Sequence, residues 1–84
     1  MQYEQRTIEH FFQEYGVEDA DMKAKLLPLL THIIYGYNQH VIKLEKETDA
    51  YKKKQIETSL EEIASKIKQV IESVKSGQSA GYEA

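Results

Sequence analysis

The clearest hydrophobic pattern in the chain runs from residue 56 to residue 74. Apolar side chains recur there at alternating intervals of four and three residues, and most positions between them are polar or charged: Ile56, Leu60, Ile63, Ile67, Val70 and Val74. Such intervals place side chains on one face of an α-helix. The pattern therefore predicts a long amphipathic helix whose apolar seam needs a covering surface, from the same chain or from a second copy.

A shorter helical pattern lies near the N-terminus. Its apolar residues share one helix face: Ile8, Phe11, Phe12 and Tyr15. Thr7 precedes this face and is a good N-cap, and Gly16 stands where a helix C-terminus favours glycine. We predict a helix from Ile8 to Tyr15, followed by a turn.

A third helical period covers residues 22–44, with Asp19 or Asp21 as its N-cap. Pro28 interrupts it, because proline removes one backbone hydrogen bond and clashes with the preceding turn. Gly36 offers a second break, after which Asn38 is a potential cap for a new helix. The pattern leaves open whether the helix is kinked or ends at either position.

The apolar signal thins between residues 45 and 55, without glycine or proline. In one interpretation the chain turns there, Thr48 or Asp49 caps the last helix, and residues 22–46 and 50–75 form an antiparallel hairpin. In another, a single helix continues to Lys75; the capping-box pattern at Ser59 gives a third possible start. We favour the hairpin, because a single domain has to cover its seam.

These elements predict an all-α fold: a small bundle of three to four helices, in which a short N-terminal helix packs on a long antiparallel helical hairpin. Residues 1–76 are expected to form a single helical domain. Residues 77–84 are small, polar and glycine-bearing, which is typical of a flexible tail. The chain has no cysteine, no signal-peptide pattern and no apolar run long enough for a membrane span, so we expect a cytoplasmic protein.

The sequence lacks the residue patterns that are typical of catalysis or of metal and cofactor binding. His10, His32 and His40 do not have the spacing of a single metal site, and the acidic residues at 18–21 lack the calcium-loop pattern. We also find no phosphate-binding glycine loop and no nucleophile motif. We therefore expect a protein that is not an enzyme and that holds no cofactor or metal.

Aromatic content and charge favour protein binding instead. The 84 residues include six tyrosines, two phenylalanines and no tryptophan, and the net charge is −3. Residues 1–21 hold six acids and one arginine, whereas residues 22–84 hold ten lysines and eight acids. Four aromatic residues are candidates for contact with a partner protein: Phe12, Tyr15, Tyr35 and Tyr37. Gly36, between the last two, either leaves backbone accessible or lets another helix approach closely.

We therefore expect a helical protein–protein interaction module, such as a small inhibitor, immunity-type or adaptor protein. A short, acidic and helical chain of this kind is similar to many small bacterial and phage proteins, but this similarity does not identify a partner. The alternative is a self-assembling, coiled-coil-like structural protein, a homodimer or larger oligomer built on the 56–74 seam. A nucleic-acid-binding regulator that uses the lysines at 43–54 is disfavoured, because acidic residues interrupt that run.

Overall fold

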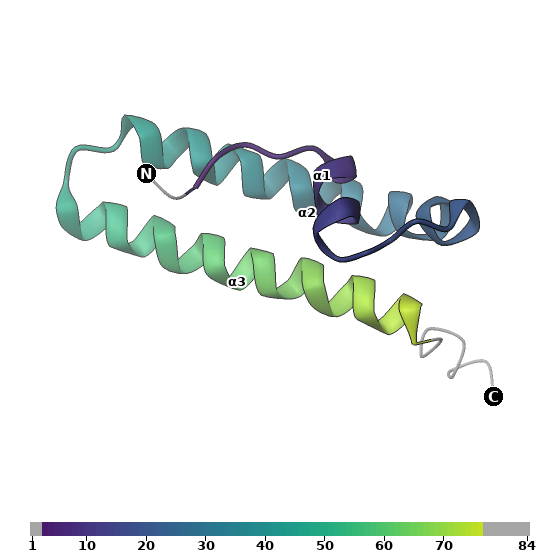
Figure 1. The fold of residues 1–84 in the computed structure, drawn as a ribbon. Helices are drawn as coiled ribbons and strands as arrows, with labels where there is room; N and C mark the ends of the chain where they lie inside the picture. The colour runs from purple at the N-terminus through teal and green to yellow at the C-terminus, as the bar shows by residue number, and fades with distance from the viewer. Residues whose placement is uncertain (1–2, 77–84) are drawn as a thin grey trace.

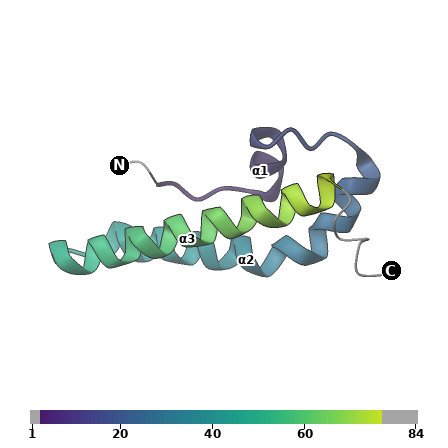
Figure 2. The same ribbon diagram turned by 90° about the horizontal axis from the view of Figure 1, so that it is seen from below.

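The computed structural model describes residues 3–76, and within this range the chain is all-α. It contains the helices α1 (Ile8–Glu14), α2 (Ala20–Lys46) and α3 (Ala50–Lys75) and no strand. Figure 1 shows α2 and α3 side by side and running in opposite directions, with residues 47–49 between them. α1 and the extended residues 3–7, here called the N-terminal strap, lie across one side of this pair (Figure 2). The predicted tail lies outside the described residues.

Polar side chains that the sequence identified as caps begin all three helices. Thr7, Asp19 and Asp49 each accept a hydrogen bond from the backbone N–H three residues later, at 3.1, 2.9 and 2.9 Å. These bonds satisfy amide groups that have no partner within the helix. Asp19 rather than Asp21 therefore caps α2, and Asp49 rather than Thr48 caps α3.

Gly16 ends α1 in the conformation that the sequence suggested. Its φ is +70°, a left-handed value that glycine adopts without steric cost. The Val17 N–H then donates to the Phe12 carbonyl at 2.8 Å, and the Gly16 N–H donates to the Gln13 carbonyl at 3.4 Å. Together these bonds form a Schellman motif, with both Phe12 and Val17 buried. The chain is thereby turned from α1 toward α2.

α2 continues without interruption through Pro28, Gly36 and Asn38, so the alternatives in which the helix ends or restarts at these residues are wrong. The carbonyl that Pro28 leaves without an amide partner belongs to Ala24, which is exposed and accessible to water. Figure 2 shows α2 bending in its N-terminal part, where Pro28 lies. Because α3 begins at Ala50, the alternatives of one unbroken helix and of a start at Ser59 are also wrong.

One cluster of buried side chains joins the three helices. Its members come from α1 and the turn after it, from α2 and from α3: Phe11, Phe12, Val17, Leu26, Leu30, Ile34, Tyr37, Val41, Leu44, Leu60, Ile67 and Ile71. This corrects the predicted phase of α3, because Ile71 is fully buried although the seam pattern omitted it, whereas Ile63 and Val70 are only half-buried. The reason is that α1 and the strap cover only one side of the helix pair, which draws the core toward that side.

Candidate protein-binding face

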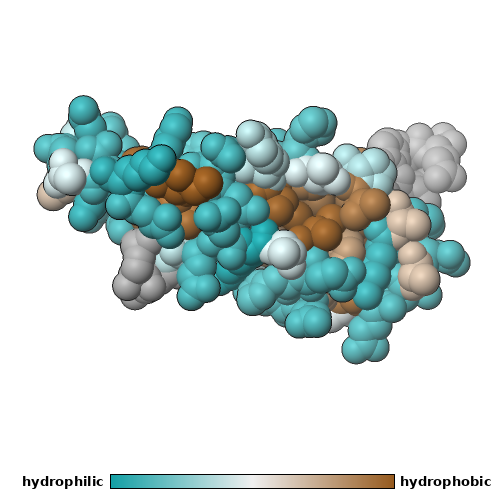
Figure 3. All heavy atoms as spheres, turned by 90° about the horizontal axis from the view of Figure 1, so that it is seen from above, coloured by the Kyte–Doolittle hydropathy of each residue, from teal (hydrophilic) through white to brown (hydrophobic). Residues whose placement is uncertain are grey.

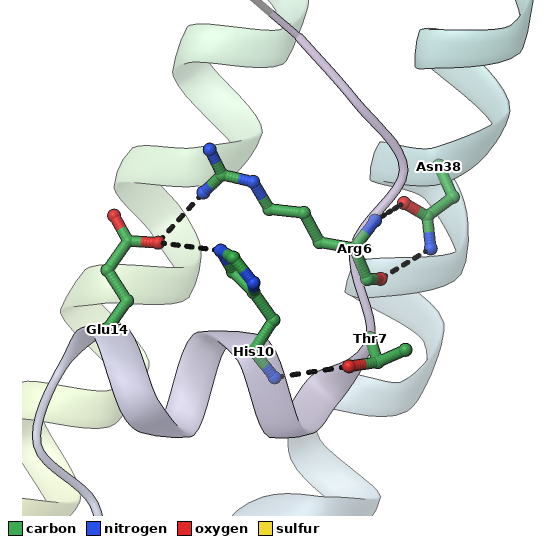
Figure 4. A network of polar contacts seen from close by, with 5 residues as sticks. All are labelled: Arg6, Thr7, His10, Glu14 and Asn38. Carbon is green, nitrogen blue, oxygen red and sulfur yellow. Dashed lines mark hydrogen bonds and ion pairs between the residues drawn. The ribbon is translucent and has the colours of Figure 1, made fainter.

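The helix pair α2–α3 has two broad sides, and the first is covered by the strap and α1. The covered side is tied to α2 by the Asn38 side chain, which holds the backbone of Arg6 in both directions (Figure 4). The Arg6 N–H donates to Asn38 Oδ1 at 2.8 Å, and Asn38 Nδ2 donates to the Arg6 carbonyl at 2.8 Å. The Arg6 side chain also pairs with Glu14 of α1 at 2.8 Å. The strap is therefore fixed to α2 and α1 together.

The covered side is tied to α3 as well. The Tyr3 hydroxyl donates to the Glu61 carboxylate at 3.0 Å, and Lys75 Nζ donates to the Tyr15 carbonyl at 2.8 Å. Below these contacts the rings of Phe11 and Tyr37 pack edge to face, with their centroids 5.6 Å apart. Residues 57, 61, 68 and 75 of α3 therefore face the strap side, since helical periodicity places them on one flank.

The opposite side of the helix pair lies beneath no other element of the described chain (Figures 1 and 2). Near the α2–α3 turn, Ile56 lines a shallow surface depression with His40 and Lys43 of α2 and with Lys52 of α3. Positions 63 and 70 repeat every seven residues from Ile56, so they share its flank of α3. On α2, positions 33 and 29 lie seven and eleven residues before His40 and share its flank. We define the open face by these apolar residues: Leu29, Ile33, Ile56, Ile63 and Val70.

The open face is apolar and accessible. Leu29 is 50% exposed, and the other four members are half-buried against the core. The α2 sequence from Leu26 to Ile42 contains no Asp, Glu, Lys or Arg, over seventeen residues. Figure 3 looks onto the outer side of α2, where the open face is seen only from its edge, and shows hydrophobic surface in separate areas between hydrophilic side chains. Depletion of charge around apolar side chains is typical of the centre of a protein–protein interface.

The structure does not bring the four predicted partner-binding aromatics together on one surface. Phe12 and Tyr37 lie in the core, with 1% and 3% of their surface exposed. Tyr15 is half-buried at the end of α1, whereas Tyr35 is 64% exposed on the outer side of α2. Of these four residues, only Tyr35 offers a large exposed aromatic surface. A methyl group added to Gly36 would have no neighbour within 4 Å, so the prediction of a close helix approach there is wrong.

The predicted self-association seam is divided between two environments. Leu60 and Ile67 are fully buried in the core of the chain itself. Ile56, Ile63, Val70 and Val74 are half-buried, and the first three contribute to the open face. The sequence pattern thus included residues from both the core side and the open face of α3 without distinguishing the two.

The Asn38 contact with Arg6 and the Tyr3 contact with Glu61 were not predicted. They join residues 32 and 58 positions apart, a separation at which the sequence carries no periodic signal. Within residues 3–76, no three His, Cys, Asp or Glu side chains are grouped closely enough to hold a metal ion. No described helix is both long and apolar enough to cross a membrane.

Comparison of the chain with known protein families, with curated proteins and with solved structures gave no significant match.

Proposed function

We propose that this protein is a non-enzymatic interaction module that acts by binding a partner protein through its open face. A small inhibitor, an immunity-type protein and an adaptor all act in this way. One observation carries the proposal: the helix pair has its strap side tied down by specific contacts, while apolar side chains on the other side remain accessible. Apolar side chains that form a contiguous accessible patch are typical of a protein-binding site.

The expected strength of such binding is moderate. Fully burying one exposed Leu or Ile side chain contributes about 1.5–3 kcal/mol, and the open-face side chains are already partly covered. Part of the gain is offset by the lost freedom of the two molecules. The open face therefore suits a reversible complex, as an inhibitor or adaptor requires.

Site-specific photo-crosslinking tests the proposal. A photoreactive phenylalanine analogue is placed at Leu29, in the open face, and separately at Thr58, which is exposed elsewhere on α3. In cells that produce the protein, we expect a defined partner protein to crosslink at Leu29 and not at Thr58. The Val70→Lys change should abolish that product while circular dichroism shows the fold unchanged. Absence of any crosslinked protein, or equal products at both positions, would contradict the proposal.

A second candidate function is self-assembly into a homodimer, which the seven-residue repeat of Ile56, Ile63 and Val70 on an accessible surface favours. Light scattering over a wide concentration range tests it, with and without Ile63→Asp. A dimer that this change dissociates without unfolding would support self-assembly. A strictly monomeric mass at high concentration would exclude it.

A further inference from the structure

Four exposed lysines surround the open face, two on each helix. Lys43 of α2 and Lys52 of α3 line the same depression as Ile56. Lys66 lies three residues after Ile63 and four before Val70, so it adjoins both on the helix surface. On α2, Lys25 lies four residues before Leu29. The apolar residues are therefore flanked by positive charge along both edges.

Acidic groups at this side are fewer. Glu47 lines the depression near Ile56, but it is half-buried and its carboxylate accepts the Asp49 N–H at 3.2 Å. Glu62 adjoins Lys66 at the outer edge of α3, and Asp21 lies four residues before Lys25 on α2. The four lysines around the open face therefore outnumber these three acids, although the whole chain carries a net charge of −3.

The covered side shows what kind of element packs against this helix pair. α1 presents Phe11 and Phe12 to the core and carries Glu9 and Glu14 on its other faces. Its Glu9 lies 3.6 Å from Lys23 of α2. An acidic amphipathic helix thus already occupies one side of the pair, with a lysine at its edge.

We propose that the open face binds an acidic amphipathic helix of the partner protein, an inference that rests on the proposed function. Apolar side chains of that helix, spaced three and four residues apart, contact Ile33 and Ile63 between α2 and α3. Its Asp and Glu residues lie along both edges, where Lys25 and Lys43 face one flank and Lys52 and Lys66 face the other. A second copy of this chain fits less well, because like lysines would meet around a shared apolar centre.

The lysines are expected to select the partner more than to hold it. An exposed ion pair changes affinity by only roughly two- to fivefold. Pairs along both edges nevertheless add up when an acidic helix is compared with a basic one, because each favourable contact is replaced by repulsion. Charge preference is therefore the property to measure.

Two synthetic amphipathic peptides about five turns long provide the probe. Both carry the same leucines, and the flanking positions are Glu in one peptide and Lys in the other. Fluorescence anisotropy measures binding to the purified full-length protein at low and high salt. We expect the acidic peptide to bind at least about tenfold more tightly than the basic one, with a preference that shrinks as salt rises.

Charge reversal on the protein supplies the matched control. The double change Lys52→Glu and Lys66→Glu should lower affinity for the acidic peptide and raise it for the basic one. Lys54→Glu with Lys68→Glu makes the same charge change at the same spacing on α3, but away from the open face, and should leave the preference in place. Circular dichroism of each variant verifies folding.

Equal binding of the two peptides, tighter binding of the basic one, or an equal effect of both double changes would overturn the inference. So would failure of the acidic peptide to bind, including the case in which light scattering shows a stable dimer that occupies the open face. If a protein still crosslinks at Leu29 in any of these cases, the proposed function stands and only the acidic-helix partner is excluded. If no protein crosslinks, the proposed function itself fails.

Discussion

At the scale of single residues, Asn38 has the most specific structural role. An asparagine in the middle of a helix is a weak helix former, because its side chain competes for backbone hydrogen bonds. Here the amide is half-buried and its oxygen and nitrogen both bond to Arg6, 32 residues away in sequence. Asn38 therefore positions the strap and does not cap a helix.

Replacing Asn38 with Ala removes both bonds to the strap. We expect the free energy of unfolding to fall by about 1–3 kcal/mol, because the Arg6 backbone groups lose their partner. Urea denaturation measures this change, and hydrogen exchange should show faster exchange of the Arg6 amide. Gln39→Ala, at the exposed neighbouring position, is the control and should have little effect. Equal stability of the two variants would contradict the assigned role of Asn38.

Replacing glycine with alanine should change the stability of the protein in opposite directions at the two internal glycines of the described chain. Gly16→Ala forces a left-handed φ on a residue with a Cβ and should cost about 1–2 kcal/mol. Gly36 lies within α2 with open space around it, so Gly36→Ala should stabilise the protein by about 0.5–1 kcal/mol. Thermal melting of both variants tests the pair. A loss of stability in both would mean that Gly36 has a packing role.

At the scale of elements, α3 carries two parallel lines of apolar residues with different roles. Leu60, Ile67 and Ile71 are fully buried, whereas Ile56, Ile63 and Val70 are half-buried on the open side. Such adjacent lines occur when an apolar stripe is wider than the surface that covers it. The second line is the part of α3 that contributes to the open face.

The same substitution in the two lines should separate these roles. Ile71→Ala creates a cavity in the core and should lower the free energy of unfolding by about 2–5 kcal/mol. Ile63→Ala removes the same atoms from a half-exposed site and should cost about 1 kcal/mol. Chemical denaturation measures both values. A loss at position 63 as large as that at position 71 would indicate that the open face is covered in solution.

At the scale of the whole molecule, tyrosines on the strap side make the stability of the fold depend on pH. Burial raises the pKa of the Tyr37 phenol, with a partly opposing contribution from Arg6, and burial likewise raises the pKa of Tyr15. The folded protein therefore favours the neutral phenols more strongly than the unfolded chain does. This contribution to stability is complete below about pH 10 and is lost as pH rises from there through the folded-state pKa.

We accordingly expect the free energy of unfolding to decline steeply above about pH 10. Tyr37→Phe removes one of the shifted groups while keeping the ring that packs on Phe11, so its decline should be shallower. Urea denaturation at a series of alkaline pH values compares the two proteins. Identical slopes would show that Tyr37 does not contribute to the pH dependence.

Much of the local structure could be predicted because its signals lie within a few residues. The cap residues and Gly16 act on neighbouring backbone groups, so Thr7 and Gly16 were identified directly and Asp19 and Asp49 were among the named alternatives. The continuity of α2 through Pro28 was missed, because packing of the whole helix on α3 outweighs the loss of one hydrogen bond. Of the aromatic residues named as candidates for partner contact, Tyr35 is exposed, whereas Phe12 and Tyr37 are buried, because burial depends on contacts with other elements that the sequence pattern does not show.

The sequence by itself determined which segments are amphipathic, the cap of α1 and the short list of residues from which the caps of α2 and α3 come. Only the tertiary structure decided which flank of each apolar stripe is covered. Ile71 and Val70 are neighbours of similar hydrophobicity, and one is buried while the other remains accessible because α1 and the strap lie on a single side. Helical periodicity shows that one face of a helix is apolar. It does not show which element covers that face, because the covering depends on contacts between residues far apart in the chain.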